Sequence, residues 1–184
     1  CQAGKDASGK DQSEDVQLTV SAAASLKDVL TELSSEYKKD HPNVTVKFNF
    51  GSSGALQQQI EQGAPADLFF SAAQDKFDRL VEQGLISKSD SVNLLENSLV
   101  LIVPKEKAKQ VKSFEDLTKS GVDKLAVGKP ESVPAGKYAK ETLTSLHLWS
   151  KVQSKIVYGK DVRQVLSYVE TGNADAGLVY LTDA

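Results

Sequence analysis

Short apolar runs alternate along this chain with longer stretches in which apolar residues recur about every three or four positions. The short runs predict strands, and the longer stretches predict amphipathic helices that turn one face toward a core. Strands are expected at residues 17–20, 44–50, 67–71, 97–103, 125–127, 156–158 and 176–180. Helices are expected at about 26–39, 55–62 and 74–83, with one more that begins at residue 134 and a separate one that ends at residue 170. Strands and helices in alternation are typical of an α/β fold with mostly parallel sheets and flanking helices.

The order of these elements predicts two lobes. Residues 16–97 carry three strand–helix units and form the expected lobe one, and residues 98–180 form lobe two. The chain is expected to cross between the lobes first at 97–103, and residues 181–184 begin a return crossing to lobe one. Residues 1–15 are polar, rich in Gly, Ser, Lys and Asp, and without periodicity, which is the composition of a flexible tether.

Two strands of the first half run directly into small residues, then a serine, then a helix. These patches place Ser25 and Ser53 at predicted helix starts. A serine there offers a hydroxyl donor beside unpaired backbone N–H groups and the positive end of the helix dipole, with little side-chain bulk. This arrangement favours the binding of an anion.

The second half of the chain repeats this pattern without the serines. Ala135 follows Val133 and Pro134 at one helix start, and Val162 follows Asp161 at another. In open α/β sheets, ligands bind beyond the carboxyl ends of the strands, where these helices begin. We therefore expect a cleft between the lobes that is lined by helix N-termini from both sides.

Composition and charge narrow the choice of partners. The chain has 184 residues and a formal net charge of -3, which argues against nucleic acid or an anionic membrane surface as a partner. The longest apolar run, at residues 98–103, is far shorter than the roughly 20 residues that a transmembrane helix needs. Two distant histidines and one cysteine predict no metal site. A bound anion must therefore be held by local groups.

The single cysteine is residue 1, and the sequence contains no methionine. This predicts a processed chain whose signal segment has been removed. Cys1 then resembles the lipid-modified cysteine of a secreted lipoprotein, which would place the protein outside the cytoplasm and anchored to the cell membrane. The alternative is a chain boundary that falls on cysteine by chance.

Five segments in the same order carry a resemblance to a known family. They are residues 22–26 (Ala-Ala-Ala-Ser-Leu), 63–69 (Gly-Ala-Pro-Ala-Asp-Leu-Phe), 97–100, 133–141 and 161–163. From residue 17 to 184 the chain resembles the periplasmic molybdate-binding proteins that feed ABC transporters. The resemblance implies a class II periplasmic-binding-protein fold with the ligand in the cleft between the lobes. The family normally continues beyond Ala184 to complete lobe one, so lobe one is expected to expose apolar surface.

The resemblance also implies a function and a site. The protein would be a monomeric receptor, not an enzyme, that binds molybdate or tungstate without any cofactor and delivers it to a membrane permease. Molybdenum would be bound as an oxyanion and not as a metal cation. Ser25 and Ser53 would each give a hydroxyl and a backbone N–H, Ala135 and Val162 would give backbone N–H groups, and Tyr180 would give its phenol O–H. Helix starts alone indicate the first four residues, whereas Tyr180 comes only from the resemblance.

Each residue also has a structural interpretation. Ser25 and Ser53 can serve as helix caps, and Tyr180 can be an ordinary core aromatic. Asp161 is expected to cap a helix. Lys137 and Arg163 follow the expected donors closely, but we expect their side chains to point to solvent.

Two other functions remain as alternatives. The first is a receptor for sulfate or another tetrahedral oxyanion, because the donor set alone does not fix the size of the ligand. The second, more distant, is a serine hydrolase, because Gly51, Ser53 and Ala55 nearly spell the Gly-x-Ser-x-Gly motif between a strand and a helix. The last glycine is missing, and neither His41 nor His147 is an evident base.

Overall fold

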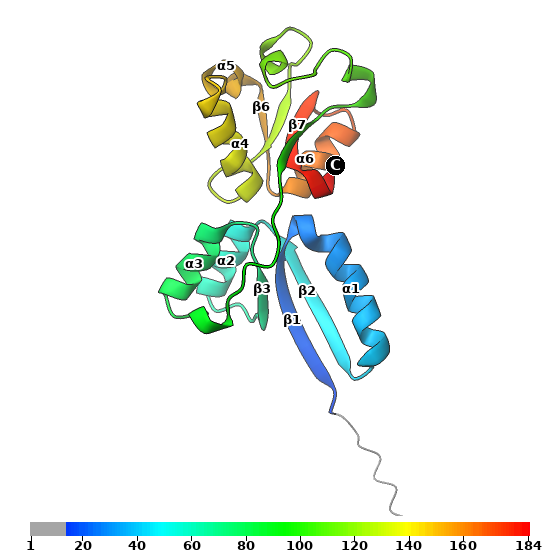
Figure 1. The fold of residues 1–184 in the computed structure, drawn as a ribbon, viewed down its shortest axis with the longest axis vertical. Helices are drawn as coiled ribbons and strands as arrows, with labels where there is room; N and C mark the ends of the chain where they lie inside the picture. The colour runs from blue at the N-terminus through cyan, green and yellow to red at the C-terminus, as the bar shows by residue number, and fades with distance from the viewer. Residues whose placement is uncertain (1–13) are drawn as a thin grey trace, which may run out of the picture.

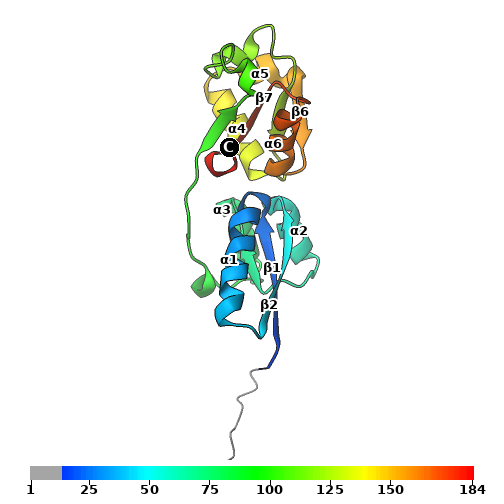
Figure 2. The same cartoon turned by 90° about the vertical axis from the view of Figure 1, so that its right-hand side faces the viewer.

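A computed structural model describes residues 14–184 as two lobes stacked along the long axis of the molecule (Figure 1). Cys1 and most of the expected tether at residues 1–15 lie outside the described residues. A view turned by 90° shows the segment that connects the lobes running along one side (Figure 2). Within residues 14–184, no helix is both long enough and apolar enough to cross a membrane.

Lobe one is built on a fully parallel sheet in the order β2-β1-β3. Its strands are β1 (Val16–Ala23), β2 (Val44–Gly51) and β3 (Leu68–Phe70), and its helices are α1 (Lys27–Asp40), α2 (Ser53–Glu61) and α3 (Gln74–Glu82). Strand β1 extends three residues further than the sequence predicts, because Ser21, Ala22 and Ala23 pair with residues 49–51 of β2. The carboxyl ends of β1 and β2 therefore lie together at the edge that faces lobe two.

Lobe two contains a four-stranded sheet in the order β4-β7-β5-β6. Its strands are β4 (Leu99–Ile102), β5 (Leu125–Gly128), β6 (Ile156–Gly159) and β7 (Ala176–Tyr180), and its helices are α4 (Pro134–Ser145), α5 (Trp149–Val152) and α6 (Val162–Glu170). Strand β5 is parallel to β6 and β7, whereas β4 is antiparallel to β7. Short 3-10 helices complete the chain at Ala24–Leu26, Lys88–Asp90, Lys105–Lys107, Glu115–Thr118, Gln153–Lys155 and Leu181–Asp183.

The crossing between the lobes differs from the expectation. Residues 91–98 cross without regular structure, and β4 is an edge strand of lobe two rather than a crossing strand. The backbone N–H of Leu181 bonds to the carbonyl of Ser98 at 2.8 Å, so the end of β7 lies beside this crossing segment. The apolar run at 97–103 predicted a strand, but this strand is half-buried at the edge of the sheet rather than fully buried, and the run could not show which sheet it joins.

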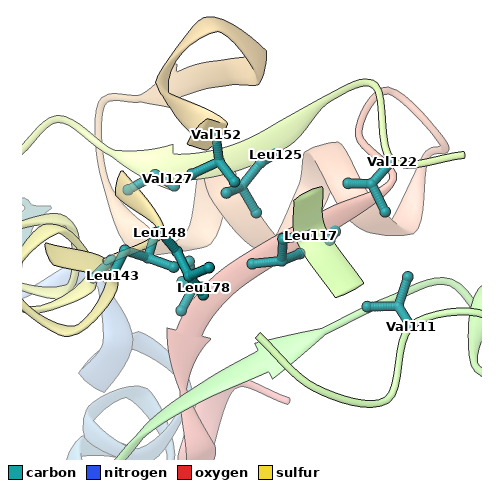
Figure 3. Close-up of a cluster of buried hydrophobic side chains, with 11 residues drawn as sticks. Val111, Leu117, Val122, Leu125, Val127, Leu143, Leu148, Val152 and Leu178 are labelled. Atoms are coloured by element: carbon teal, nitrogen blue, oxygen red, sulfur yellow. The ribbon is translucent and has the colours of Figure 1, made fainter. Parts of the chain in front are cut away.

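The larger hydrophobic core belongs to lobe two. Figure 3 shows Leu125, Val127 and Leu178 of the sheet packed with Leu143 of α4 and Val152 of α5. Helix α6 covers the opposite face of the same sheet through a second cluster of buried residues. The two central strands, β5 and β7, are therefore buried on both faces, as their continuous apolar residues predict, whereas β4 and β6 are partly exposed.

Lobe one exposes apolar surface, as expected. Helix α1 has no buried residue, and Val29, Leu33 and Tyr37 on its apolar face are 55%, 60% and 45% exposed. The buried apolar side chains of lobe one lie instead around β1, α2 and α3, and include Val20, Leu56 and Leu80. The rigid part of this lobe is thus the part that faces the cleft.

Candidate functional site

A small pocket of about 10 Å³ lies between the lobes at the carboxyl ends of both sheets. The five residues expected to bind the ligand all line this single pocket. They are Ser25, Ser53, Ala135, Val162 and Tyr180. The structure therefore brings together residues that are up to 155 positions apart in the sequence (180 minus 25).

Lobe one supplies the two serines. Ser25 lies in the short 3-10 helix between β1 and α1, and it is half-buried. Ser52, not Ser53, caps α2, because its hydroxyl accepts the backbone N–H of Ala55 at 3.4 Å. Ser53 is the first residue of α2 and is fully buried, and its hydroxyl accepts the backbone N–H of Ala72 at 2.9 Å. The Ser53 side chain is therefore not used as a helix cap.

Lobe two supplies two helix starts. Pro134 occupies the first position of α4, where its missing N–H costs nothing, and Ala135 follows it. Asp161 caps α6 as predicted, because its carboxylate accepts the backbone N–H of Gln164 at 2.8 Å, and Val162 is the first residue of this helix. The first N–H groups of a helix have no partner within it. The backbone N–H groups of Ala135 and Val162 are thus available to a ligand.

Tyr180 lies at the end of β7 and reaches across to lobe one. Its phenol donates to the carbonyl of Ala72 at 3.4 Å, which is a long hydrogen bond. Burial raises the pKa of the Tyr180 phenol well above its ordinary value. The group therefore keeps its proton and remains a hydrogen-bond donor.

Ala72 is a pocket residue that the sequence did not indicate. Its backbone meets both Ser53 and Tyr180, and it lies just beyond β3 at the same edge as the other strand ends. An alanine that acts only through its backbone N–H and carbonyl cannot be recognised as a binding residue from its side chain. Its position two residues after a strand was the one feature that could have indicated it.

The pocket carries almost no fixed charge. Among its lining residues in the described chain, Asp161 is the only ionisable one besides Tyr180, and none is Lys, Arg or His. One Asp161 oxygen is occupied by the helix cap. The walls therefore offer neutral N–H and O–H donors and the positive ends of helix dipoles.

The expectation that Lys137 and Arg163 point to solvent was wrong. Lys137 of lobe two lies 3.1 Å from the carboxylate of Asp75 in lobe one, and Arg163 of lobe two pairs with Asp28 in lobe one. The close approach of the lobes brings the helix starts of one lobe opposite those of the other (Figure 1). Neither cation lines the pocket.

A backbone contact also joins the lobes next to the pocket. The N–H of Gly54 in α2 donates to the carbonyl of Ser132 at 3.0 Å. A Cβ atom at Gly54 would lie 2.7 Å from that oxygen, so only glycine permits this approach. The lobes are thus in direct contact on the Gly54 side of the pocket.

Among residues 14–184, no histidine lies beside the Ser53 hydroxyl in the pocket as a serine hydrolase would need. The partner of the Ser53 hydroxyl is a backbone N–H, and neither His41 nor His147 lines the pocket. Among residues 14–184, no three or more His, Cys, Asp or Glu side chains gather into a group that could hold a metal ion.

Comparison with known proteins assigns the chain to a protein family. Residues 18–184 match the model of a family described as bacterial extracellular solute-binding proteins. The chain belongs to this family.

Several relatives of this solute-binding protein carry more specific names. It is 61% identical over 177 residues to YvgL of Bacillus subtilis, named as a candidate ABC transporter substrate-binding lipoprotein; the match covers 96% of this chain and 67% of YvgL. It is 43% identical over 174 residues to the molybdate-binding protein ModA of Haemophilus influenzae, covering 91% of this chain and 67% of the relative. The chain thus spans about two thirds of the length of both relatives.

A solved structure of a molybdate-binding protein has a similar fold. The periplasmic molybdate-binding protein of Azotobacter vinelandii matches with a TM-score of 0.81 and 30% sequence identity, over 89% of this chain and 71% of that one. The expected two-lobed periplasmic-binding-protein fold is confirmed.

Proposed function

We propose that this solute-binding protein is an extracytoplasmic receptor that binds molybdate or tungstate between its lobes and delivers it to the membrane permease of an ABC importer. It acts by binding alone, without catalysis or a cofactor. The observation that carries the proposal is the set of neutral donors on the pocket walls, to which both lobes contribute. The names of the H. influenzae and A. vinelandii relatives support molybdate as the ligand.

The proposed donors are sufficient in strength. Ser25 and Ser53 contribute hydroxyl and backbone N–H groups, Ala135 and Val162 contribute backbone N–H groups, and Tyr180 contributes its phenol. A hydrogen bond to a charged group contributes about 1.5–3 kcal/mol, and a helix N-terminus adds about 0.3–2 kcal/mol. Micromolar binding requires about 8 kcal/mol after the costs of association. The set reaches this value without a lysine or arginine in contact with the anion.

A pocket lined by hydrogen-bond donors also discriminates between protonated and fully deprotonated anions. Molybdate, tungstate and sulfate carry no proton near neutral pH, whereas hydrogen phosphate carries one that requires an acceptor. Among the described residues the only carboxylate that lines the pocket is Asp161, and one of its two oxygens already accepts the N–H of Gln164, which leaves few acceptors for the proton of hydrogen phosphate. We therefore expect fully deprotonated oxyanions to bind more tightly than phosphate.

The proposal includes a lipid anchor at Cys1. The support is the lipoprotein name of the B. subtilis relative together with the cysteine at residue 1. Mass spectrometry of the protein isolated from its native host should find a diacylglycerol-modified Cys1. An unmodified Cys1 in that sample would remove the anchor from the proposal and leave the receptor function standing.

Calorimetric titration tests the ligand. Molybdate and tungstate should bind far more tightly than sulfate, and phosphate should bind least. Sulfate binding as tight as molybdate binding would instead identify a general tetrahedral-oxyanion receptor. Covalent labelling of Ser53 by a fluorophosphonate probe would overturn the receptor function in favour of a hydrolase.

A further inference from the structure

Four charged side chains lie near the starts of four of the helices that begin at the cleft. Asp28 in α1 pairs with Arg163 in α6, and Asp75 in α3 pairs with Lys137 in α4. Each pair joins a helix of lobe one to a helix of lobe two. Figure 1 shows α1 near α6 on one side of the cleft and α3 near α4 on the other. We call these two contacts the interlobe ion pairs.

The position of the two cations is unfavourable within their own helices. The N-terminus of a helix is the positive end of its dipole, which stabilises acidic side chains and opposes basic ones. Asp28 and Asp75 obey this rule. Arg163 and Lys137 break it, and α4 and α6 have no acidic residue in their first turns. A local rule that is broken at a cleft indicates a role outside the helix itself.

The charged residues of the ion pairs lie one to three positions along the chain from residues that line the pocket. In lobe one, Asp28 comes three residues after Ser25, and Asp75 comes three residues after Ala72. In lobe two, Lys137 comes two residues after Ala135, and Arg163 comes one residue after Val162. None of the four charged residues itself lines the pocket. The charges therefore act on the segments that carry the proposed donors without contacting the ligand.

Arg163 also lies close to a second carboxylate. Its Nε lies 3.4 Å from a carboxylate oxygen of Asp183, whose side chain is fully buried beyond the end of β7. Asp28 and Asp183 thus lie on two sides of one guanidinium, in different lobes. Arg163 thus lies at the lobe boundary, where it pairs with Asp28.

We propose that the two interlobe ion pairs stabilise the closed arrangement of the lobes and thereby set the affinity for the oxyanion, while the ligand contacts only neutral donors. This inference rests on the proposed receptor function. Each pair can form only when the lobes are as close as they are here, so it shifts the equilibrium between open and closed forms toward closed.

The first test measures closure without ligand. Spin labels at Ser35→Cys in lobe one and Lys151→Cys in lobe two, in a Cys1→Ser background, report the interlobe distance by pulsed EPR. Asp75→Lys should shift the distribution to longer distances, and the double variant Asp75→Lys/Lys137→Asp should restore it. The matched control is Lys39→Glu, which breaks an exposed ion pair to Glu36 within α1 and should change nothing. An unchanged distribution in both Asp75→Lys and Asp28→Asn would overturn the inference.

The second test measures the affinity for molybdate. Exposed ion pairs have coupling energies that correspond to about a two- to fivefold change in an equilibrium constant. Asp28→Asn should therefore raise Kd by about two- to fivefold, and Asp75→Lys, which adds repulsion, by about three- to tenfold. The Debye length falls to about 4 Å near 0.5 M salt, so the ratio of variant to wild-type Kd should shrink there to below about twofold.

The two proposals fail in different ways. Wild-type protein that does not bind molybdate would contradict the receptor function, and the EPR distances would still test the ion pairs. Wild-type protein that binds molybdate while the charge variants keep the same Kd and the same distances would overturn the ion pairs alone.

Discussion

The hydroxyl oxygen of Ser53 lies 2.9 Å from the backbone nitrogen of Ala72 and accepts its hydrogen bond. A hydroxyl has one proton to donate, and this bond leaves that proton free. Among the described residues no acceptor takes it, and Ser53 lines the pocket. The orientation of the Ser53 hydroxyl is therefore set before any ligand binds, which lowers the cost of ordering it.

Replacement of Ser53 by alanine should weaken molybdate binding. The variant loses one hydrogen bond to a charged ligand, which corresponds to about a 10- to 100-fold increase in Kd. Titration calorimetry measures this directly. The matched control is Ser52→Ala, which removes the cap of α2 and should lower the unfolding free energy by about 0.5–2 kcal/mol with a smaller effect on Kd. A larger loss of affinity in Ser52→Ala than in Ser53→Ala would contradict the assignment.

Replacement of Gly54 by alanine should impair closure. The new Cβ would lie 2.7 Å from the carbonyl oxygen of Ser132 and 2.8 Å from its Cα, and both atoms belong to the other lobe. Overpacking of this kind costs about 1–3 kcal/mol, so Kd should rise by at least about fivefold. Because the clash lies between the lobes, thermal unfolding of the ligand-free protein should be nearly unchanged. Wild-type affinity in this variant would show that the Gly54–Ser132 contact is absent from the bound form.

Tyr180 should remain a donor at high pH. Burial raises the pKa of its phenol, so the neutral form persists above pH ~10, where an ordinary tyrosine ionises. The molybdate affinity of the wild type should therefore not fall through loss of this proton up to about pH 10. Tyr180→Phe should raise Kd by about tenfold at every pH in this range. A wild-type affinity that declines between pH 9 and 10, while that of Tyr180→Phe stays constant, would refute this role.

Asp183→Asn should stabilise the folded chain at neutral pH. Burial raises the pKa of the Asp183 carboxyl more than Arg163 lowers it, and its oxygens form no hydrogen bond within the described residues. The contact at 3.4 Å from Arg163 is thus an incomplete ion pair. With a raised folded-state pKa, the stability from the protonated form is present below the ordinary Asp pKa of ~3.9 and is lost as pH rises through the folded-state value.

The gain from Asp183→Asn is expected to be about 1 kcal/mol at pH 7 and to diminish toward pH 4. Urea denaturation at the two pH values measures it. A variant less stable than the wild type at pH 7 would mean that the Arg163–Asp183 pair outweighs the cost of burial.

Much of the fold was predictable because its signals are local. Apolar periodicity, Pro134 at a helix start and Gly63 after α2 gave most elements to within a few residues, and Gly63 has the positive φ of +87° that suits a helix end. The antiparallel pairing of β4 with β7 was not predictable, because residues 99–102 meet partners nearly 80 positions away. Helix α5, with four residues, is too short to show a period.

The residues of the candidate site were likewise predictable only where their signals are local in the sequence. Helix starts indicated Ser25, Ser53, Ala135 and Val162 from their own neighbourhoods, and the resemblance added Tyr180. The sequence could not show that Ser52 rather than Ser53 caps α2, since either serine can do so. The partners of Lys137 and Arg163 lie 62 and 135 positions away, so only the approach of the two lobes reveals them.

The central claim is that neutral donors alone contact the oxyanion. A crystal structure of the molybdate complex, with the metal located by its anomalous scattering, tests this most directly. The account predicts one molybdenum atom in the interlobe pocket, with its oxygens accepting hydrogen bonds from Ser25, Ser53, Ala135, Val162 and Tyr180. A lysine or arginine in contact with the anion, or the backbone N–H groups of Ala135 and Val162 directed away from it, would contradict the account.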